Sequence, residues 1–249
     1  FFHSLPCRFS VTVAAEKRMD NPTCRHICQD MTQTSDILIV GGGLNGPMLA
    51  LAAAKSGLRS TVIDARPEGA RRSDNFDGRS YALALASIRM LTALGLWGGL
   101  RADAQPMHEI KVSDGRAGDA EVFLGLHFNS AEIEEGPMGH LLEDRYLRRA
   151  LLDAMTAEPL VTHLPGQTVV DQSVTASGAS VTLASGEVLA GALIIGADGR
   201  QSGTGLRAGI RRTAWDYPQT ALVCAIAHEK PHGGVAHQLF MPAGPLAIL

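Results

Sequence analysis

Four glycines occur within six positions directly after an apolar run, in the stretch ILIVGGGLNGPM. Glycine loses more conformational freedom on folding than any other residue, so this cluster indicates that the backbone needs something only glycine provides. The pattern is Gly41-x-Gly43-x-x-Gly46. It follows a strand expected at 36–40 and precedes a helix expected at 47–56. In such a pattern the glycines permit a tight turn, close approach to a diphosphate, and close helix–strand packing.

A second strand is expected at 59–64, and its last residue is Asp64, 23 positions after Gly41. An acidic residue at this place can accept hydrogen bonds from a ribose hydroxyl. Together, the strand, glycine loop, helix, second strand and terminal acid predict a bound dinucleotide with its diphosphate at the helix N-terminus. A turn that binds nothing is the alternative. The spacing does not choose between NAD and FAD.

Another apolar run, ALIIGADGRQS, ends in Asp198 and Gly199. An aspartate at the end of a strand, beside a glycine, can accept hydrogen bonds from hydroxyl or amide groups. An ordinary Asp-Gly turn is the alternative interpretation of this pair.

Composition excludes several classes of protein. The chain has 249 residues, of which 45% are hydrophobic, so it can bury one large core or two smaller ones. A net charge of -3 argues against a nucleic-acid partner. No apolar run approaches the roughly 18 to 20 residues that span a bilayer. Four cysteines do not make a disulfide scaffold in a chain of this length, and the spacing of Cys24 and Cys28 predicts no metal site.

The rest of the chain alternates helical and strand patterns. Further helices are expected at 80–96 and 143–157. Strands are expected at 109–113, 121–124, 161–164, 168–172, 179–183, 192–195, 220–227, 237–241 and 246–249. This order predicts an α/β fold with an inserted part that is rich in β-structure.

The segment IIGADGRQS resembles the second fingerprint of the flavin-dependent aromatic hydroxylases, the class A flavoprotein monooxygenases that include p-hydroxybenzoate hydroxylase. The resemblance implies that Asp198, with Gly199, faces both FAD and the path of NAD(P)H. That class also carries an arginine after the second strand, which the segment DGRSYAL supplies as Arg79. A planar guanidinium suits the FAD diphosphate region. A solvated loop arginine is the alternative.

Two further segments are similar to the ubiquinone-biosynthesis FAD-dependent hydroxylases. They are LLEDRYLRRAL, at 141–151, and the long run 215–249 that ends in FMPAGPLAIL. The resemblance implies a Rossmann-like FAD-binding domain, of the type found in p-hydroxybenzoate hydroxylase, with an inserted and mostly antiparallel β-sheet substrate domain. It also implies cofactor contacts at Gly41, Gly43, Gly46, Asp64, Arg79, Asp198 and Gly199.

The chain departs from this family at several points. Asp144 stands where the family has Asn or Gln near the flavin, and Gly205 stands where its second fingerprint has an arginine, with Arg207 nearby. The third flavin motif of the family is absent, so we expect a C-terminally truncated fragment. The expected division is a non-native or disordered extension at 1–30, a FAD-binding domain at 31–105 and 140–213, and part of the substrate-binding sheet at 106–139 and 214–249.

The family resemblance implies an FAD- and NAD(P)H-dependent monooxygenase that uses O2 to hydroxylate the aromatic ring of a polyprenylated phenol in ubiquinone biosynthesis. Because the cofactor supplies the chemistry, the sequence nominates no catalytic residue. His237 and Gln238 either face the substrate or are ordinary sheet-face residues. The cysteine usage predicts a cytoplasmic protein. The apolar substrate implies that this protein associates peripherally with the inner membrane or with a ubiquinone-biosynthesis complex.

Three alternatives stay open at this stage. The first is another FAD-dependent oxidoreductase of the same fold, such as an epoxidase, halogenase or reductase. The second is an NAD-dependent dehydrogenase, in which the pair Asp198-Gly199 would lack a role. The third is an inactive nucleotide-binding fragment.

Overall fold

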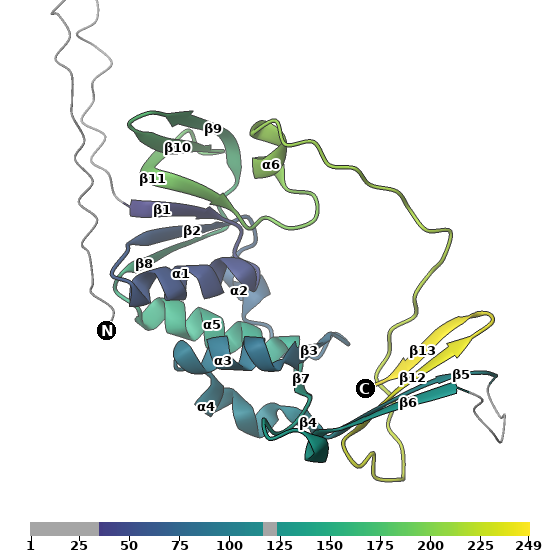
Figure 1. Ribbon diagram of the computed structural model, residues 1–249. Coiled ribbons are helices and arrows are strands. Elements are labelled where there is room, and N and C mark those ends of the chain that lie inside the picture. The colour runs from purple at the N-terminus through teal and green to yellow at the C-terminus, as the bar shows by residue number, and fades with distance from the viewer. Residues whose placement is uncertain (1–34, 117–123) are drawn as a thin grey trace, which may run out of the picture. The chain divides into compact units, whose positions relative to one another are not determined.

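The computed structural model describes residues 35–116 and 124–249 (Figure 1). The extension expected at 1–30 lies outside the described residues. The helices are α1 (Asn45–Lys55), α2 (Glu68–Arg71), α3 (Leu85–Ala93), α4 (Trp97–Leu100), α5 (Asp144–Ala157) and α6 (Gly203–Arg207). Short 3-10 turns occupy Arg101–Asp103 and Ser130–Glu132. Within the described ranges, no helix is long and apolar enough to cross a membrane.

Thirteen strands complete the described structure. They are β1 (Ser35–Val40), β2 (Ser60–Asp64), β3 (Ser80–Ala84), β4 (Gln105–Met107), β5 (Glu109–Asp114), β6 (Leu124–Asn129), β7 (Gly139–Glu143), β8 (Val161–Pro165), β9 (Val169–Thr175), β10 (Gly178–Leu183), β11 (Val188–Gly196), β12 (Val235–Met241) and β13 (Gly244–Ile248).

Six strands form the sheet that carries both glycine motifs, in the order β8-β2-β1-β11-β10-β9. The first four strands in this order, β8, β2, β1 and β11, are parallel to one another. The last two, β10 and β9, continue the sheet in antiparallel pairing. Leu38 and Ile39 in β1 have no exposed surface. This burial is typical of a parallel strand that is covered on both faces. Together with α1 and β2, the strand confirms the predicted order of strand, glycine loop, helix and second strand, which forms a βαβ unit.

The two faces of this sheet have separate apolar layers. On one face, Ile39 packs in a cluster with Ala50 of α1 and Leu151 of α5, and Figure 1 shows these two helices alongside the sheet. On the other face, Leu38 packs in a cluster with Val181 of β10. Neighbouring residues of β1 therefore enter different layers, as the two-residue period of a strand requires.

The helix predicted at 80–96 is wrong over its first five residues. Ser80–Ala84 is the strand β3, which pairs antiparallel with β7 and places Tyr81 opposite Leu142. Alanine and leucine favour a helix locally, but pairing with a strand almost 60 residues later overrides that preference. The helix α3 ends before Gly95, whose φ of +80° suits a helix C-terminus. The next two glycines, Gly98 and Gly99, lie inside the short helix α4.

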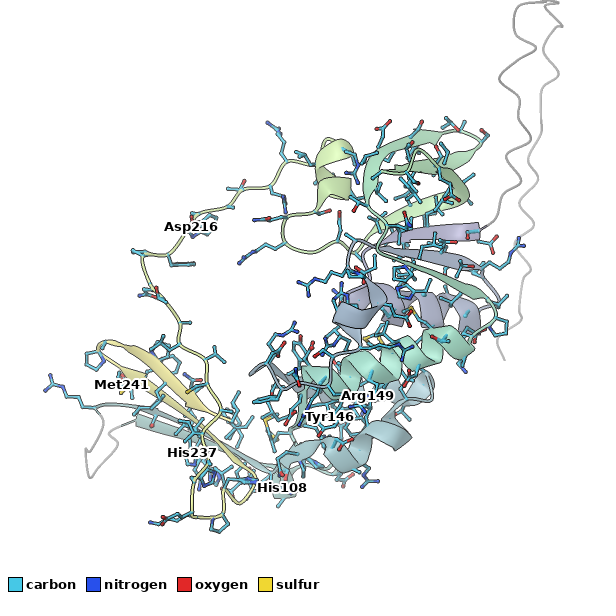
Figure 2. All side chains as sticks on the ribbon, turned by 180° about the vertical axis from the view of Figure 1, so that it is seen from behind. His108, Tyr146, Arg149, Asp216, His237 and Met241 are labelled. Atoms are coloured by element: carbon cyan, nitrogen blue, oxygen red, sulfur yellow. The ribbon has the colours of Figure 1, made fainter. Side chains whose placement is uncertain are left out.

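A separate four-stranded sheet has the order β13-β12-β5-β6. Two antiparallel hairpin pairs, β5–β6 and β12–β13, join through the parallel pair β5–β12. Figure 2 labels His237 and Met241 on β12. The strands predicted at 109–113, 237–241 and 246–249 are confirmed with small shifts of their ends. Of the strand predicted at 121–124, only Leu124 belongs to the described residues, where β6 begins.

The strand predicted at 220–227 is wrong, because the structure has no strand there. Leu222 and Val223 are 93% and 81% exposed. A strand needs a hydrogen-bonded neighbour, and no described strand pairs with this segment. The β-forming composition of the segment is therefore insufficient by itself to make a strand.

Candidate functional site

The glycine loop between β1 and α1 is held by contacts that only glycine permits. A Cβ atom on Gly46 would lie 1.9 Å from the carbonyl oxygen of Gly41, which packs the start of α1 against the end of β1. Gly41 itself has a φ of +118°, in the region that side chains disfavour. In contrast, a Cβ on Gly43 would meet nothing within 4 Å. Gly43 therefore presents bare backbone to open space at the start of the helix.

Among the described residues, no side chain caps the N-terminus of α1. Its cap residue Leu44 makes no side-chain hydrogen bond, and its first turn carries no acidic residue. The first N–H groups of a helix have no partner within the helix, and its dipole favours an anion at this end. The uncapped helix and the open space beside Gly43 fit a diphosphate.

The second motif lies directly beside the first one. β11 pairs in parallel with β1, which places Gly196 opposite Val40, and the N–H of Ala197 donates to the carbonyl oxygen of Val40 at 2.7 Å. A Cβ on Gly41 would lie 2.3 Å from the carbonyl oxygen of Ala197. The carboxyl ends of adjacent parallel strands thus bring the two loops together, at the edge where such sheets bind ligands.

Asp64 ends β2 next to the same glycine loop. It is 3% exposed, and a Cβ on Gly42 would lie 2.3 Å from its Oδ2 atom. Its carboxylate accepts a bidentate pair of hydrogen bonds from Arg71, from Nε at 2.7 Å and from Nη2 at 3.0 Å. The backbone N–H of Arg66 also donates to Oδ1 at 3.0 Å. The carboxylate predicted to accept from a ribose therefore lies beside the glycine loop, and an arginine from α2 binds it.

Asp198 binds the beginning of α6. Its Oδ1 accepts from the hydroxyl of Ser202, and its Oδ2 accepts from the N–H and the hydroxyl of Thr204, both at 2.9 Å. Burial raises the pKa of this carboxyl, but the hydrogen bonds from Ser202 and Thr204 outweigh burial and hold the pKa below its ordinary value. Gly199 follows with a φ of +86°, and a Cβ there would meet nothing within 4 Å.

Arg79 makes its ion pairs with two carboxylates that belong to neither glycine loop. Its Nη2 lies 2.6 Å from Asp77 and 3.1 Å from Asp144, and about half of its side chain is exposed. Asp144 is buried at the start of α5, where it also accepts from the Tyr81 hydroxyl at 2.9 Å and lies 3.3 Å from Arg148 Nε. The pKa of Tyr81 is raised by burial and by its bond to this carboxylate. Asp144, the residue that departs from the family pattern, is thus a buried carboxylate that contacts two arginines and a tyrosine.

Gly205 and Arg207 show how the second fingerprint departs from the family. The N–H of Gly205 donates to the hydroxyl of Ser202 at 2.9 Å, which caps α6. Arg207 directs its Nε to Gln172 Oε1 on β9, at 3.2 Å. Arg207, which lies two residues after the position where the family has its arginine, therefore holds α6 against β9.

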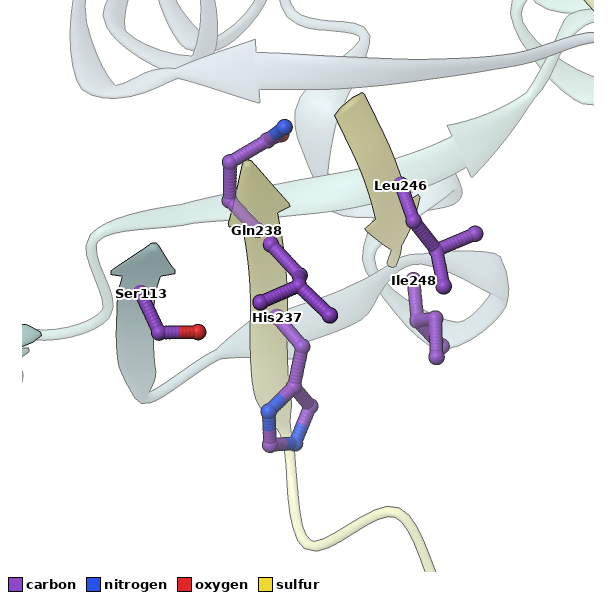
Figure 3. A pocket seen from close by; sticks show the side chains of 6 residues that line it. Ser113, His237, Gln238, Leu246 and Ile248 are labelled. Carbon is purple, nitrogen blue, oxygen red and sulfur yellow. The ribbon is translucent and has the colours of Figure 1, made fainter. Parts of the chain in front are cut away.

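An open groove lies on the four-stranded sheet (Figure 3). It has a volume of about 290 Å³ and is lined by Ser113, His237, Gln238, Leu239, Leu246 and Ile248. The register places His237 opposite Ile248, and Leu239 opposite Leu246 and Ser113. Figure 3 shows the side chains of His237 and Gln238 pointing apart. The groove therefore combines one imidazole and one hydroxyl with three aliphatic side chains.

Sequence reasoning missed the partners that surround the predicted site residues. Arg71 belongs to no motif, and nothing in the local sequence indicates that its side chain reaches the end of a strand seven residues earlier. Ser202 and Thr204 were detectable, since a Ser at the N-cap position is a helix-start signal. The cluster around Asp144 joins segments more than 60 residues apart, which no local pattern reveals.

The model of the FAD binding domain family matches residues 34–237. The chain is 41% identical over 217 residues to the ubiquinone hydroxylase UbiL of Rhodospirillum rubrum, a match that covers 87% of this chain and 49% of that protein. It is 32% identical over 225 residues to the 3-demethoxyubiquinol 3-hydroxylase of Escherichia coli, covering 87% and 54%. The chain thus spans about half the length of the curated relatives it matches, and their names confirm the resemblance to ubiquinone-biosynthesis hydroxylases.

Solved structures agree with this placement. The chain resembles PqsL of Pseudomonas aeruginosa, named as a probable FAD-dependent monooxygenase, with a TM-score of 0.61 and 25% identity over 74% of this chain and 48% of that one. The p-nitrophenol 4-monooxygenase PnpA of Pseudomonas putida shares the fold, with a TM-score of 0.58 and 18% identity over 70% and 43% of the two chains. This chain therefore belongs to the FAD binding domain family.

Proposed function

We propose that this chain is part of an FAD- and NAD(P)H-dependent monooxygenase that hydroxylates the aromatic ring of a polyprenylated phenol in ubiquinone biosynthesis. The observation that carries the proposal is the contact between Gly41 and Ala197, which unites both flavin motifs in one site. One relative named as a ubiquinone hydroxylase and another named as a 3-demethoxyubiquinol 3-hydroxylase each match 87% of the chain, and they support the substrate class.

The proposed cofactor site uses the residues that surround the two loops. Gly43 and the start of α1 would hold the FAD diphosphate, with Gly41 and Gly46 shaping the loop and Asp64 accepting from the ribose. Asp198 and Gly199 would border the cofactor from the neighbouring strand end, and Arg79 would add positive charge. When bound, FAD supplies the redox chemistry by passing electrons from NAD(P)H to O2. The side chains and backbone groups of the protein bind the cofactor, orient the substrate and exclude water from the site.

We also propose the division into a FAD-binding part, 31–105 with 140–213, and a substrate part, 106–139 with 214–249. The six-stranded sheet uses strands from the first part, and the four-stranded sheet uses strands from the second. The groove beside His237 is the proposed place for the phenol ring. Its aliphatic side chains suit an apolar ring, and Ser113 and His237 offer polar contacts to a ring hydroxyl.

The prenyl chain of such a substrate is insoluble in water, which supports action at the surface of the inner membrane or within a ubiquinone-biosynthesis complex. We propose that the protein reaches this surface from the cytoplasm. Vesicle flotation tests this part of the proposal. The protein should float with vesicles that contain the prenylated phenol more than with empty vesicles of the same lipid.

Product analysis tests the reaction itself. The full translated product of the gene should be supplied with FAD, NADPH or NADH, O2 and a short-chain prenylphenol. The proposal expects a product heavier by one oxygen atom, which becomes labelled when the gas is ¹⁸O2. Consumption of NAD(P)H without a labelled ring would reject ring hydroxylation and favour another flavin-dependent reaction.

A further inference from the structure

The strongest unassigned feature is the ion pair between Arg71 and Asp64. Both guanidinium contacts are short, and the side chains of Arg71 and Asp64 are only 15% and 4% exposed. This pair is therefore partly desolvated and bidentate, the geometry in which an arginine–carboxylate pair is strongest. Arg71 comes from α2, outside every motif that predicts the nucleotide site.

Most of the acceptor positions on the carboxylate of Asp64 are already occupied by hydrogen bonds within the chain. An ionised carboxylate has about four acceptor positions. Arg71 takes one on each oxygen, and the N–H of Arg66 takes a second one on Oδ1. One position remains, on Oδ2, the atom next to Gly42. A ribose offers two adjacent hydroxyls, so its full diol cannot bind while Arg71 keeps both contacts.

We propose that Arg71 is a specificity-determining residue that competes with the adenosine ribose for Asp64, so that nucleotide binding displaces its guanidinium. The inference rests on the proposed function, because it concerns the same cofactor site. In the ligand-free chain, Arg71 keeps the buried carboxylate of Asp64 paired. Only a ligand with two suitably placed hydroxyls replaces both hydrogen bonds that Arg71 donates. The pair thereby lowers the affinity for a nucleotide that carries the ribose diol, and it leaves the affinity for a ligand without the diol unchanged.

The position of Arg71 permits this exchange. It is the last residue of the four-residue helix α2, which has no buried residues. Moving its side chain therefore breaks no apolar packing of α2.

Arg72 provides a matched control. It is the next residue in the chain and carries the same charge, but its side chain is 37% exposed. It pairs with Glu68 at 2.8 Å and with Asp153 at 2.6 Å, rather than with Asp64. A change that acts only through net charge near the site should therefore appear equally at both arginines.

The test compares the affinities of ADP and 2′,3′-dideoxy-ADP for the whole chain and for its variants Arg71→Met and Arg72→Met. ADP stands for the adenosine diphosphate half of FAD. In Arg71→Met, the affinity ratio of the two ligands should rise about tenfold over that of the unmodified chain, because a hydrogen bond to a charged group becomes available. Arg72→Met should leave the ratio unchanged. A ratio that is unchanged or reduced in Arg71→Met overturns the proposal.

A second measurement needs no variant and remains decisive if Arg71→Met fails to fold. The unmodified chain is treated with phenylglyoxal, which modifies accessible guanidinium groups, with and without saturating ADP. Mass spectrometry should find faster modification of Arg71 when ADP is bound, and the same rate at Arg72. Slower or unchanged modification of Arg71 overturns the proposal. If neither ADP nor FAD binds any form of the chain, the cofactor site itself is rejected instead.

Discussion

Gly41 and Ala197 are in direct backbone contact, and a Cβ atom on Gly41 would lie 2.3 Å from the Ala197 carbonyl oxygen. These residues are 156 positions apart in the sequence, and each belongs to a different motif loop. The contact explains why the fold needs a glycine at the first position of the fingerprint. It also separates the roles of the three glycines, since Gly43 contacts nothing that a Cβ would disturb.

Gly41→Ala should destabilise the chain by about 3 kcal/mol or more, because it adds backbone strain at a positive φ to an overlap with Ala197. Urea unfolding followed by circular dichroism measures the change. The variant should bind FAD poorly because the two loops can no longer meet. A variant as stable as the parent would show that the contact is not required.

Gly43→Ala should behave in the opposite way. Its Cβ meets nothing in the protein, so the free energy of unfolding should stay within about 1 kcal/mol of the parent value. Its affinity for FAD should fall at least tenfold, because the methyl group occupies the space proposed for the diphosphate. Gly69→Ala is the control, since a Cβ there also meets nothing and Gly69 lies in α2 rather than in the glycine loop. Equal FAD affinity in both variants would place the diphosphate elsewhere.

Asp144→Ala should cost about 3 to 5 kcal/mol, because it leaves the largely buried Arg148 without its carboxylate partner and Tyr81 without its acceptor. Asp153→Ala removes an exposed partner of Arg72 and should cost less than about 1 kcal/mol. Chemical unfolding of the two variants gives the comparison. Similar small losses in both would mean that the Asp144 cluster adds no more than a surface ion pair.

Acid should weaken the contribution of Asp198. Its pKa is lower in the folded chain than its ordinary value of 3.8, since bonds from Ser202 and Thr204 stabilise the ionised form against the opposing effect of burial. The stabilisation is therefore present above the ordinary pKa and is lost as the pH falls through the lower folded value. The stability difference between the parent chain and Asp198→Asn should shrink as the pH is lowered from 6 towards 3. A constant difference would contradict this assignment.

The parts of the fold that local sequence determines could be predicted. The βαβ unit follows from the apolar run of β1, the glycines and the strand ending on Asp64, all within about thirty residues. The strands β8 to β11 follow from their composition and from turns at Gly178 and Gly186, which have positive φ values. In these segments, local preference and tertiary pairing agree.

Other features depend on partners far away in the sequence. Ser80–Ala84 has the composition of a helix and becomes a strand because β7 lies beside it, whereas 220–227 has the composition of a strand and lacks a described neighbour. In the site, the glycines and Asp64 could be predicted from spacing. The contacts of Arg71 and of Asp144 could not be predicted. They are made by arginine side chains, whose long reach leaves no periodic pattern in a sequence.

The most direct test of the central claim is the visible absorption spectrum of the purified chain after incubation with FAD and gel filtration. We expect retained flavin bands at close to one FAD per chain, with the bands absent from Gly43→Ala treated in the same way. A colourless parent chain that retains no FAD and shows no FAD binding by calorimetry would contradict the assignment of this site.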